Sequence, residues 1–123
     1  MTEEIYKKMY IAVLDEVPDY MVPTLVAHSV LGAHLKYFSG ECEAEDFSAY
    51  NYYYDWLNNS FRKVVLRVNR KEFDKIQNTQ ECYAGYENTT LNGEKSCLVV
   101  LPVDSDKVPN VLKYSKLWKP KEN

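Results

Sequence analysis

The chain has 123 residues, which is the length of one domain. Hydrophobic residues make up 46% of it, enough for one core, and a charged content of 27% with few glycines and prolines argues against a disordered or fibrous chain. No apolar stretch approaches the roughly 18 residues that a membrane span needs, and the acidic start Met1-Thr2-Glu3-Glu4 is unlike a secretory signal. Three cysteines without metal-ligand spacing indicate reduced thiols. We therefore expect one domain in the cytoplasm, with no membrane association, no cofactor and no metal.

The net charge of −3 hides an asymmetry between the two halves of the chain. Residues 1–61 carry three lysines and ten carboxylates, whereas residues 62–123 carry twelve lysines and arginines and eight carboxylates. Strong nucleic-acid binders usually have a basic total, because neutralisation of phosphates drives their affinity. The acidic total argues against such a role, although the second half has enough basic residues for a local patch.

Apolar runs and helical spacing predict the elements of the first half. Residues 9–14 form a short continuous apolar run, which is typical of a strand buried on both faces. Residues 22–35 are apolar almost all round and predict a buried helix, with Pro23 in its first turn. Residues 38–46 read as an acidic linker. A second helix follows, and the stripe that it is expected to bury consists of Phe47, Tyr50, Tyr54 and Leu57.

The same signals continue in the second half. Residues 64–68 predict a second strand, and Asn69 with Glu72 has capping-box spacing at the start of a third helix. Residues 82–86 and 97–101 predict two further strands. A last helix is expected after the capping residues at 104–106, with its apolar face formed by Val108, Val111, Leu112, Ser115 and Trp118.

The elements together predict the fold. A hairpin-type turn at Asn92-Gly93 joins the last two strands, and long helical crossovers between apolar strands imply parallel pairs. The order is β-α-α-β-α-β-β-α. We expect one α/β domain over residues 1–123, built on a four-stranded mixed sheet with helices on both faces and a frayed tail at 119–123.

Common catalytic and phosphate-binding motifs are missing from the sequence. Its four glycines are scattered, and His28 and His34 do not share a helix face. The aromatic cluster from Tyr50 to Trp56 has residues that can stack on a base. The simpler interpretation is a helix that buries Tyr54 and leaves other phenols at the rim. An exposed tyrosine face also leaves a homodimer open.

Five segments carry a family resemblance. His28-Ser29-Val30-Leu31-Gly32-Ala33 matches H-A-x-x-G-A, and Trp56 is followed seven residues later by a strand of K-V-V-V-K-V type at 63–68. Tyr83-Ala84-Gly85 stands at a D-A-G position, while the last strand at 98–102 and Lys116-Leu117 match the final segments. In this order and spacing the chain resembles the peptidyl-tRNA hydrolase 2 family along nearly its whole length. The resemblance implies the α/β fold given above.

The family's chemistry does not carry over with its fold. A G-K pair precedes the matched histidine in the family, and its glycine and lysine fall here on Tyr20 and Met21. The aspartate of D-A-G becomes Tyr83. In the family this lysine and aspartate lie in the site that cleaves the ester joining peptide to tRNA. A methionine cannot donate a proton or offset charge, and a phenol makes a poor base.

The resemblance and the expected sheet together place a candidate site. Open α/β sheets bind ligands beyond the carboxyl ends of their parallel strands. The residues expected to bind a ligand there are Asp15, Asp19, Tyr20, Met21, Tyr86 and Asn88, and those that would take part in any chemistry are His28, Glu87 and Tyr83.

Two functional hypotheses follow from this site. The first is a non-catalytic binding protein that binds or sequesters a nucleotide, a tRNA or a host protein. The second is a diverged peptidyl-tRNA hydrolase, in which His28 or Glu87 is the base and Tyr83 or Tyr86 orients the substrate. The composition, rich in Tyr, Asn and Lys, resembles that of small bacteriophage accessory proteins, which would make the compartment the host cytoplasm.

Overall fold

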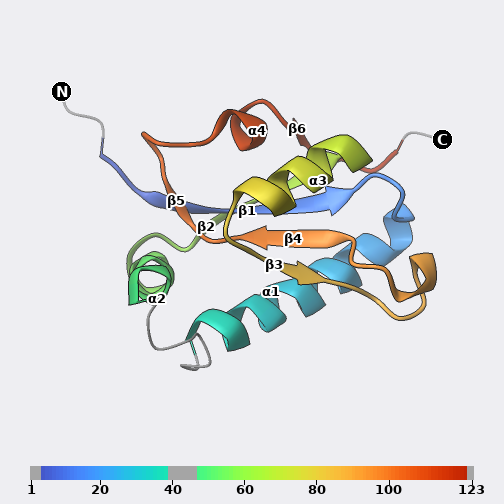
Figure 1. Cartoon of the computed structure of the whole chain (residues 1–123), viewed down its shortest axis with the longest axis horizontal. Coiled ribbons are helices and arrows are strands. Elements are labelled where there is room, and N and C mark those ends of the chain that lie inside the picture. Colours follow the sequence, from blue (N-terminus) through green and yellow to red (C-terminus); the bar gives the residue numbers. More distant parts are fainter. Residues whose placement is uncertain (1–3, 39–46, 122–123) are drawn as a thin grey trace.

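The computed structural model of the chain describes residues 4–38 and 47–121, in which helices cover both faces of one mixed β-sheet (Figure 1). The strands are β1 (Lys7–Leu14), β2 (Arg62–Val68), β3 (Cys82–Gly85), β4 (Cys97–Val100), β5 (Val103–Asp104) and β6 (Lys116–Leu117). The helices are α1 (Val22–Phe38), α2 (Phe47–Asp55), α3 (Arg70–Thr79) and α4 (Asn110–Lys113), with 3-10 turns at Asp19–Met21 and Leu91–Gly93 and a π-helical turn at Trp56–Ser60. The predicted acidic linker at 39–46 lies outside the described residues.

The strand order is β3-β4-β1-β2-β6, and β5 also pairs with β1. β1 runs parallel to β2 and antiparallel to β4, and β4 in turn is antiparallel to β3. The three strands β1, β2 and β3 therefore run in the same direction. Their carboxyl ends meet at one edge of the sheet, which is where ligands bind in open α/β sheets.

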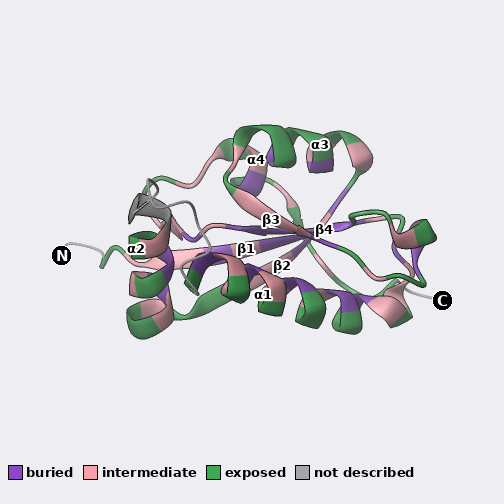
Figure 2. Cartoon of the chain, turned by 60° about the horizontal axis from the view of Figure 1, so that its bottom comes forward, coloured by how far each residue is buried: buried purple, intermediate pink, exposed green. Residues whose placement is uncertain are grey.

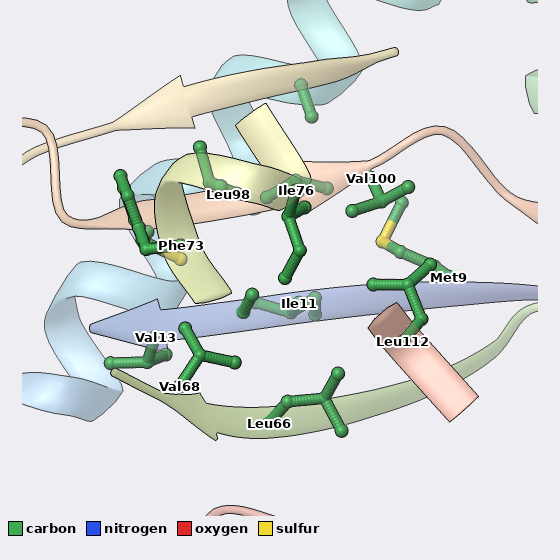
Figure 3. Close-up of a cluster of buried hydrophobic side chains, with 14 of the residues drawn as sticks. Met9, Ile11, Val13, Leu66, Val68, Phe73, Ile76, Leu98, Val100 and Leu112 are labelled. Carbon is green, nitrogen blue, oxygen red and sulfur yellow. The ribbon is translucent and has the colours of Figure 1, made fainter. Parts of the chain in front are cut away.

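The hydrophobic core fills both faces of the sheet (Figure 2). α1 packs on one face against β3 and β4, whereas α3 and α4 cover the other. A buried cluster beside α3 and α4 contains side chains from five elements (Figure 3): Met9, Ile11 and Val13 of β1, Leu66 and Val68 of β2, Leu98 and Val100 of β4, Phe73 and Ile76 of α3, and Leu112 of α4. Burial on both faces explains why β1 and β4 read as continuous apolar runs.

The sheet has six strands, so the predicted number of four is wrong. The four longer strands lie where the sequence predicted them, and the two additions, β5 and β6, are two residues each. Strands this short show no alternation of apolar and polar residues by which a pattern could be recognised. Of the adjacent strand pairs in the described part of the chain, only β1 and β2 are parallel. The neighbours on the other side of β1 are β4 and β5, and both run antiparallel to it.

The predicted last helix is mostly irregular chain. Only Asn110–Lys113 is helical. This helix begins directly after Pro109, and proline is tolerated at the start of a helix because no helical hydrogen bond needs an N–H there. Trp118, expected on the helix face, instead donates its backbone N–H to the carbonyl of Val65 at the edge of β2, over 2.9 Å. Of the tail at 119–123, which the sequence predicts to be frayed, the structure describes residues 119–121, and there the carboxylate of Asp19 accepts the backbone N–H of Lys121 over 2.6 Å.

The second helix buries a different face from the predicted one. Tyr53 and Trp56 are each 2% exposed, whereas Tyr54 is 47% exposed. Consecutive tyrosines give no contrast of hydrophobicity from which the inner face could be identified. The π-helical turn that begins at Trp56 also shifts the helical register, and the Trp56 indole donates to the carbonyl of Arg62 over 2.7 Å.

Candidate functional site

A small cavity of about 210 Å³ lies at the edge of the sheet where β1, β2 and β3 end. α1 contributes one wall, β3 a second, and the loop at 86–96 between β3 and β4 the third (Figure 1, right). The lining residues are His28, Tyr83, Gly85, Tyr86, Glu87 and Asn88. Their side chains offer donors and acceptors together with two phenol rings.

An ion pair joins two walls of this cavity. The Nε2 atom of His28 lies 2.8 Å from Oε2 of Glu87. The other carboxylate oxygen of Glu87 accepts weaker hydrogen bonds from the backbone N–H and the hydroxyl of Thr89, at 3.4 and 3.3 Å. The carboxylate is only 16% exposed and the imidazole 56% exposed. Glu87 is therefore fixed from its own loop and in turn orients an imidazole that remains open to solvent.

Tyr83 lies directly over a glycine of α1. A Cβ atom placed on Gly32 would come within 2.4 Å of the Cζ and hydroxyl oxygen atoms of Tyr83, closer than any real Cβ contact. Gly32 follows His28 by four residues, so both lie on the same face of α1. The glycine leaves room for the phenol ring against the helix, on the face that also carries His28.

A second close approach locks β3 to α1 below the cavity. A Cβ atom on Gly85 would lie 2.0 Å from the hydroxyl of Ser29. Ser29 is fully buried, and its hydroxyl donates to the carbonyl of Leu25 over 2.7 Å. Burial raises the pKa of the neighbouring Cys97 thiol to about 12. Ser29 and Cys97 are thus parts of the packing and unsuited to act as nucleophiles.

Four residues predicted to bind a ligand lie outside the cavity. Asp19 binds Nη2 of Arg67 over 3.1 Å as well as the backbone of Lys121, and the backbone N–H of Asp15 donates to the carbonyl of Val68. The hydrogen bond from the backbone of Lys121 has the largest effect on the carboxyl of Asp19, followed by the hydrogen bond from Arg67. Both hold the pKa of Asp19 below its usual value. The other two residues are Tyr20, which is 80% exposed, and Met21, which packs partly against the core.

The structure thus divides the predicted site residues into two groups. His28, Tyr83, Tyr86, Glu87 and Asn88 meet around one cavity, whereas Asp15, Asp19, Tyr20 and Met21 do not line it. Thr89 was missed, and its only signal is a hydroxyl two residues after a glutamate, a common turn pattern. Glu16, Arg70 and Glu94, which tie the same loop to α3, were missed as well.

The aromatic cluster of α2 belongs to the packing of that helix. His34 and Tyr53 are hydrogen-bonded, with Nδ1 and the hydroxyl oxygen 2.9 Å apart. Burial raises the pKa of Tyr53 to about 12. Tyr54 stacks on Phe38 and Tyr50, at ring-centre distances of 6.4 and 5.9 Å. None of these side chains lines the cavity.

Within residues 4–38 and 47–121 the structure contains no group of three His, Cys, Asp or Glu side chains placed to hold a metal ion. No helix in the same part of the chain is both long and apolar enough to cross a bilayer. No known protein-family model matches the chain, and no curated protein matches its sequence. The site itself therefore carries the functional argument.

Proposed function

We propose that the protein is a non-catalytic binding protein on a scaffold similar to that of the peptidyl-tRNA hydrolase 2 family, and that its cavity takes one ring of a nucleotide or of a tRNA. The observation that carries the proposal is the cavity lined by residues 86–88, where His28 and Glu87 contact each other beside two phenols and an amide. The order of the longer elements supports the scaffold. Met21 and Tyr83 at the family's lysine and aspartate positions support the loss of its chemistry.

The size and polarity of the cavity favour a single planar group as its occupant. Its volume of about 210 Å³ lies below the roughly 300 Å³ at which whole small-molecule sites begin. Tyr86 is 47% exposed at the rim, where its ring is free to stack on a base. The described lining residues include no lysine or arginine, so a phosphate would remain outside.

Binding to RNA and nucleotide probes tests this proposal. The probes are deacylated tRNA, an N-blocked aminoacyl-tRNA and adenosine monophosphate, titrated at low salt. Base stacking contributes about 1–3 kcal/mol, so Tyr86→Ala should weaken binding about five-fold or more. Tyr20→Ala is the matched control, because Tyr20 is also an exposed tyrosine but lies outside the cavity. Equal affinities of the two variants, or no binding of any probe, would contradict the proposal.

A diverged hydrolase is the second candidate, and the contact of 2.8 Å between His28 and Glu87 favours it. A carboxylate that orients an imidazole is the usual support of a general base. His28 would take a proton from water as the water oxygen adds to the ester carbonyl. The leaving tRNA hydroxyl would then receive that proton, and the Tyr83 phenol would donate to the developing oxyanion.

Hydrolysis of the N-blocked aminoacyl-tRNA, with protein in molar excess, separates the two candidates. A rate equal to that of buffer alone excludes the hydrolase and leaves the binding protein as the proposed function. Faster hydrolysis that His28→Ala and Glu87→Gln both abolish supports the hydrolase, and a rate unchanged in both variants removes it.

Other partners remain within the same proposal. A host protein or a second copy of the chain are the alternatives to a nucleotide, and size-exclusion chromatography at high concentration distinguishes a dimer from a monomer. We place the protein in a cytoplasm, which is supported by the free thiols of Cys82 and Cys97.

A further inference from the structure

Arg70 joins three segments that are far apart in the sequence. It is the first residue of α3, and its Nε and Nη2 atoms donate to the two carboxylate oxygens of Glu16, over 3.1 and 2.8 Å. Its Nη1 atom donates to the carboxylate of Glu94. Glu16 follows β1, and Glu94 belongs to the loop between β3 and β4. One planar guanidinium therefore bridges two carboxylates, a geometry for which arginine is suited and lysine is not.

The loop that Arg70 holds is the one that forms the cavity. Residues 86–88 line the cavity, and Glu94 lies further along the same loop. At the base of the loop the backbone N–H of Ser96 donates to the carbonyl of Gly85 over 2.9 Å. The loop is also attached through the packing of Leu91 against the core and through two ion pairs: Glu87 to His28 on α1, and Glu94 to Arg70 on α3. Because α1 and α3 lie on opposite faces of the sheet, the loop is held from both sides (Figure 1).

Backbone hydrogen bonds link the part of the loop next to Glu94 to the part that lines the cavity. Leu91, Asn92 and Gly93 are consecutive residues with positive φ angles of 48°, 56° and 76°. The N–H of Gly93 donates to the carbonyl of Thr90, and that of Thr90 to the carbonyl of Glu87. Thr90 is only 4% exposed. This compact turn connects Glu94 to Glu87 through a short series of backbone hydrogen bonds.

We propose that Arg70 is a positioning residue of the cavity, which sets the place of the loop at 86–94 and with it the contact between Glu87 and His28. Two carboxylates that share one guanidinium lie close together, and without the cation they repel each other. Removal of Arg70 therefore does more than release the loop, because the charge of Glu16 drives Glu94 away. The expected change in ligand affinity rests on the proposed function. The expected change in the loop at 86–94 does not depend on it.

Neutral and rescued variants of Arg70 test the proposal. Arg70→Met removes the bridge, and the triple variant Arg70→Met, Glu16→Gln, Glu94→Gln also removes the repulsion. Arg62→Met is the matched control, because Arg62 is an exposed arginine at the start of β2 that stacks on Tyr6, 3.8 Å from the ring centre, at the opposite end of the sheet. Amide hydrogen exchange at 86–94 and the ¹⁵N resonances of the His28 ring report the loop without any ligand.

The expected result has three parts. Arg70→Met speeds exchange at 86–94 and changes the His28 resonances, the triple variant reverses most of both changes, and Arg62→Met causes neither. Affinity for the RNA probe should fall about five-fold or more in Arg70→Met, the lower end of typical coupling between sites, and recover in the triple variant.

Each other result has a definite meaning. Loop exchange that is unchanged in Arg70→Met, or changed and not reversed in the triple variant, overturns the proposal. If Arg70→Met and the triple variant fold too poorly for exchange measurements, Arg70→Lys, which keeps the charge and loses the fork, should exchange faster at 86–94 than the wild type, and an unchanged rate overturns the proposal. Failure of the wild-type protein to bind any RNA probe would contradict the proposed function alone, since the exchange data still decide the role of Arg70.

Discussion

Two glycines determine how closely α1 approaches β3, and hence the shape of the cavity. Gly32 admits the ring of Tyr83, and Gly85 admits the hydroxyl of Ser29. Neither glycine is required by its backbone angles, because the one glycine with a positive φ angle among the described residues is Gly93. The need for glycine at these two positions is therefore a matter of space between a helix and a strand.

Gly32→Ala tests this requirement directly. The added methyl group would lie 2.4 Å from the Tyr83 ring, so we expect the ring to be displaced and the free energy of unfolding to fall by about 1–3 kcal/mol, the usual cost of overpacking. The measurement is urea denaturation, combined with the same change in a Tyr83→Ala background. In that background the cost of Gly32→Ala should largely disappear. An equal cost in both backgrounds would show that the contact with Tyr83 is not its cause.

Part of the candidate site could be predicted from the sequence. His28 and the segment from Tyr83 to Asn88 were selected by their positions in the pattern that resembles the family, and the structure brings them together around one cavity. Asp19 was selected with them, but it lies outside this cavity, where Arg67 and Lys121 bind its carboxylate. No local pattern shows which of several exposed carboxylates will meet a cation.

At the scale of elements, α4 is a short helix that depends on one side chain. It spans only Asn110–Lys113, far fewer residues than an isolated helix needs for stability. Leu112 is 1% exposed and lies in the core beside Met9 (Figure 3). The burial of this leucine, rather than helix propensity, fixes the segment on the sheet.

Leu112→Ala should therefore be costly. We expect the free energy of unfolding to fall by about 2–5 kcal/mol, the range for buried leucines replaced by alanine. Leu117→Ala is the matched control, because Leu117 is 57% exposed in β6, and it should cost much less. Thermal or urea denaturation of both variants measures the difference. Similar losses in the two variants would mean that α4 is not held by Leu112.

Helices could be predicted correctly where the sequence clearly distinguishes apolar, polar and capping positions. The capping box of Asn69 and Glu72 is present with both of its hydrogen bonds, and the helix that it opens buries Phe73 and Ile76 as expected. The inner face of α2 was not predictable, because Tyr52, Tyr53 and Tyr54 are chemically identical and only packing against α1 selects the middle one.

At the scale of the whole molecule, the stability should depend on pH at both ends of the range. Hydrogen bonds lower the pKa of Glu16, through Arg70, and that of Asp55, through Lys7. A carboxyl whose pKa is lower in the folded state stabilises it above the unfolded pKa, and this contribution is lost as the pH falls through the folded pKa. The loss therefore begins below the unfolded values of 4.5 and 3.8.

The alkaline limb has the opposite cause. Burial raises the pKa of Cys97 from 9.0 and that of Tyr53 from 10.0, each to about 12. Such groups stabilise the folded state below their unfolded pKa, and the contribution is lost as the pH rises toward 12. Urea denaturation should give a plateau from about pH 5 to about pH 8.5 and a decline on either side. Cys97→Ala should have a shallower alkaline decline than the wild type, and an identical decline would contradict this assignment.

The topology was harder to predict than the strands themselves. Apolar runs identify a strand, but they do not say which strand lies beside it or in which direction. β1 has β2 on one side and both β4 and β5 on the other. Two of these three neighbours come from the last quarter of the sequence, and no pattern within residues 7–14 indicates them.

The central place of β1 bears on the order in which the protein folds as it is synthesised. The strand leaves the ribosome before the other strands of the sheet, and it has no hydrogen-bonding partner on either side until residues 62–68 and then 97–104 have emerged. Its apolar residues remain unpaired until then, and pairing between segments so far apart in sequence is slow. A nascent chain that stalls before residue 97 would expose one complete edge of β1, the condition under which unpaired strands aggregate.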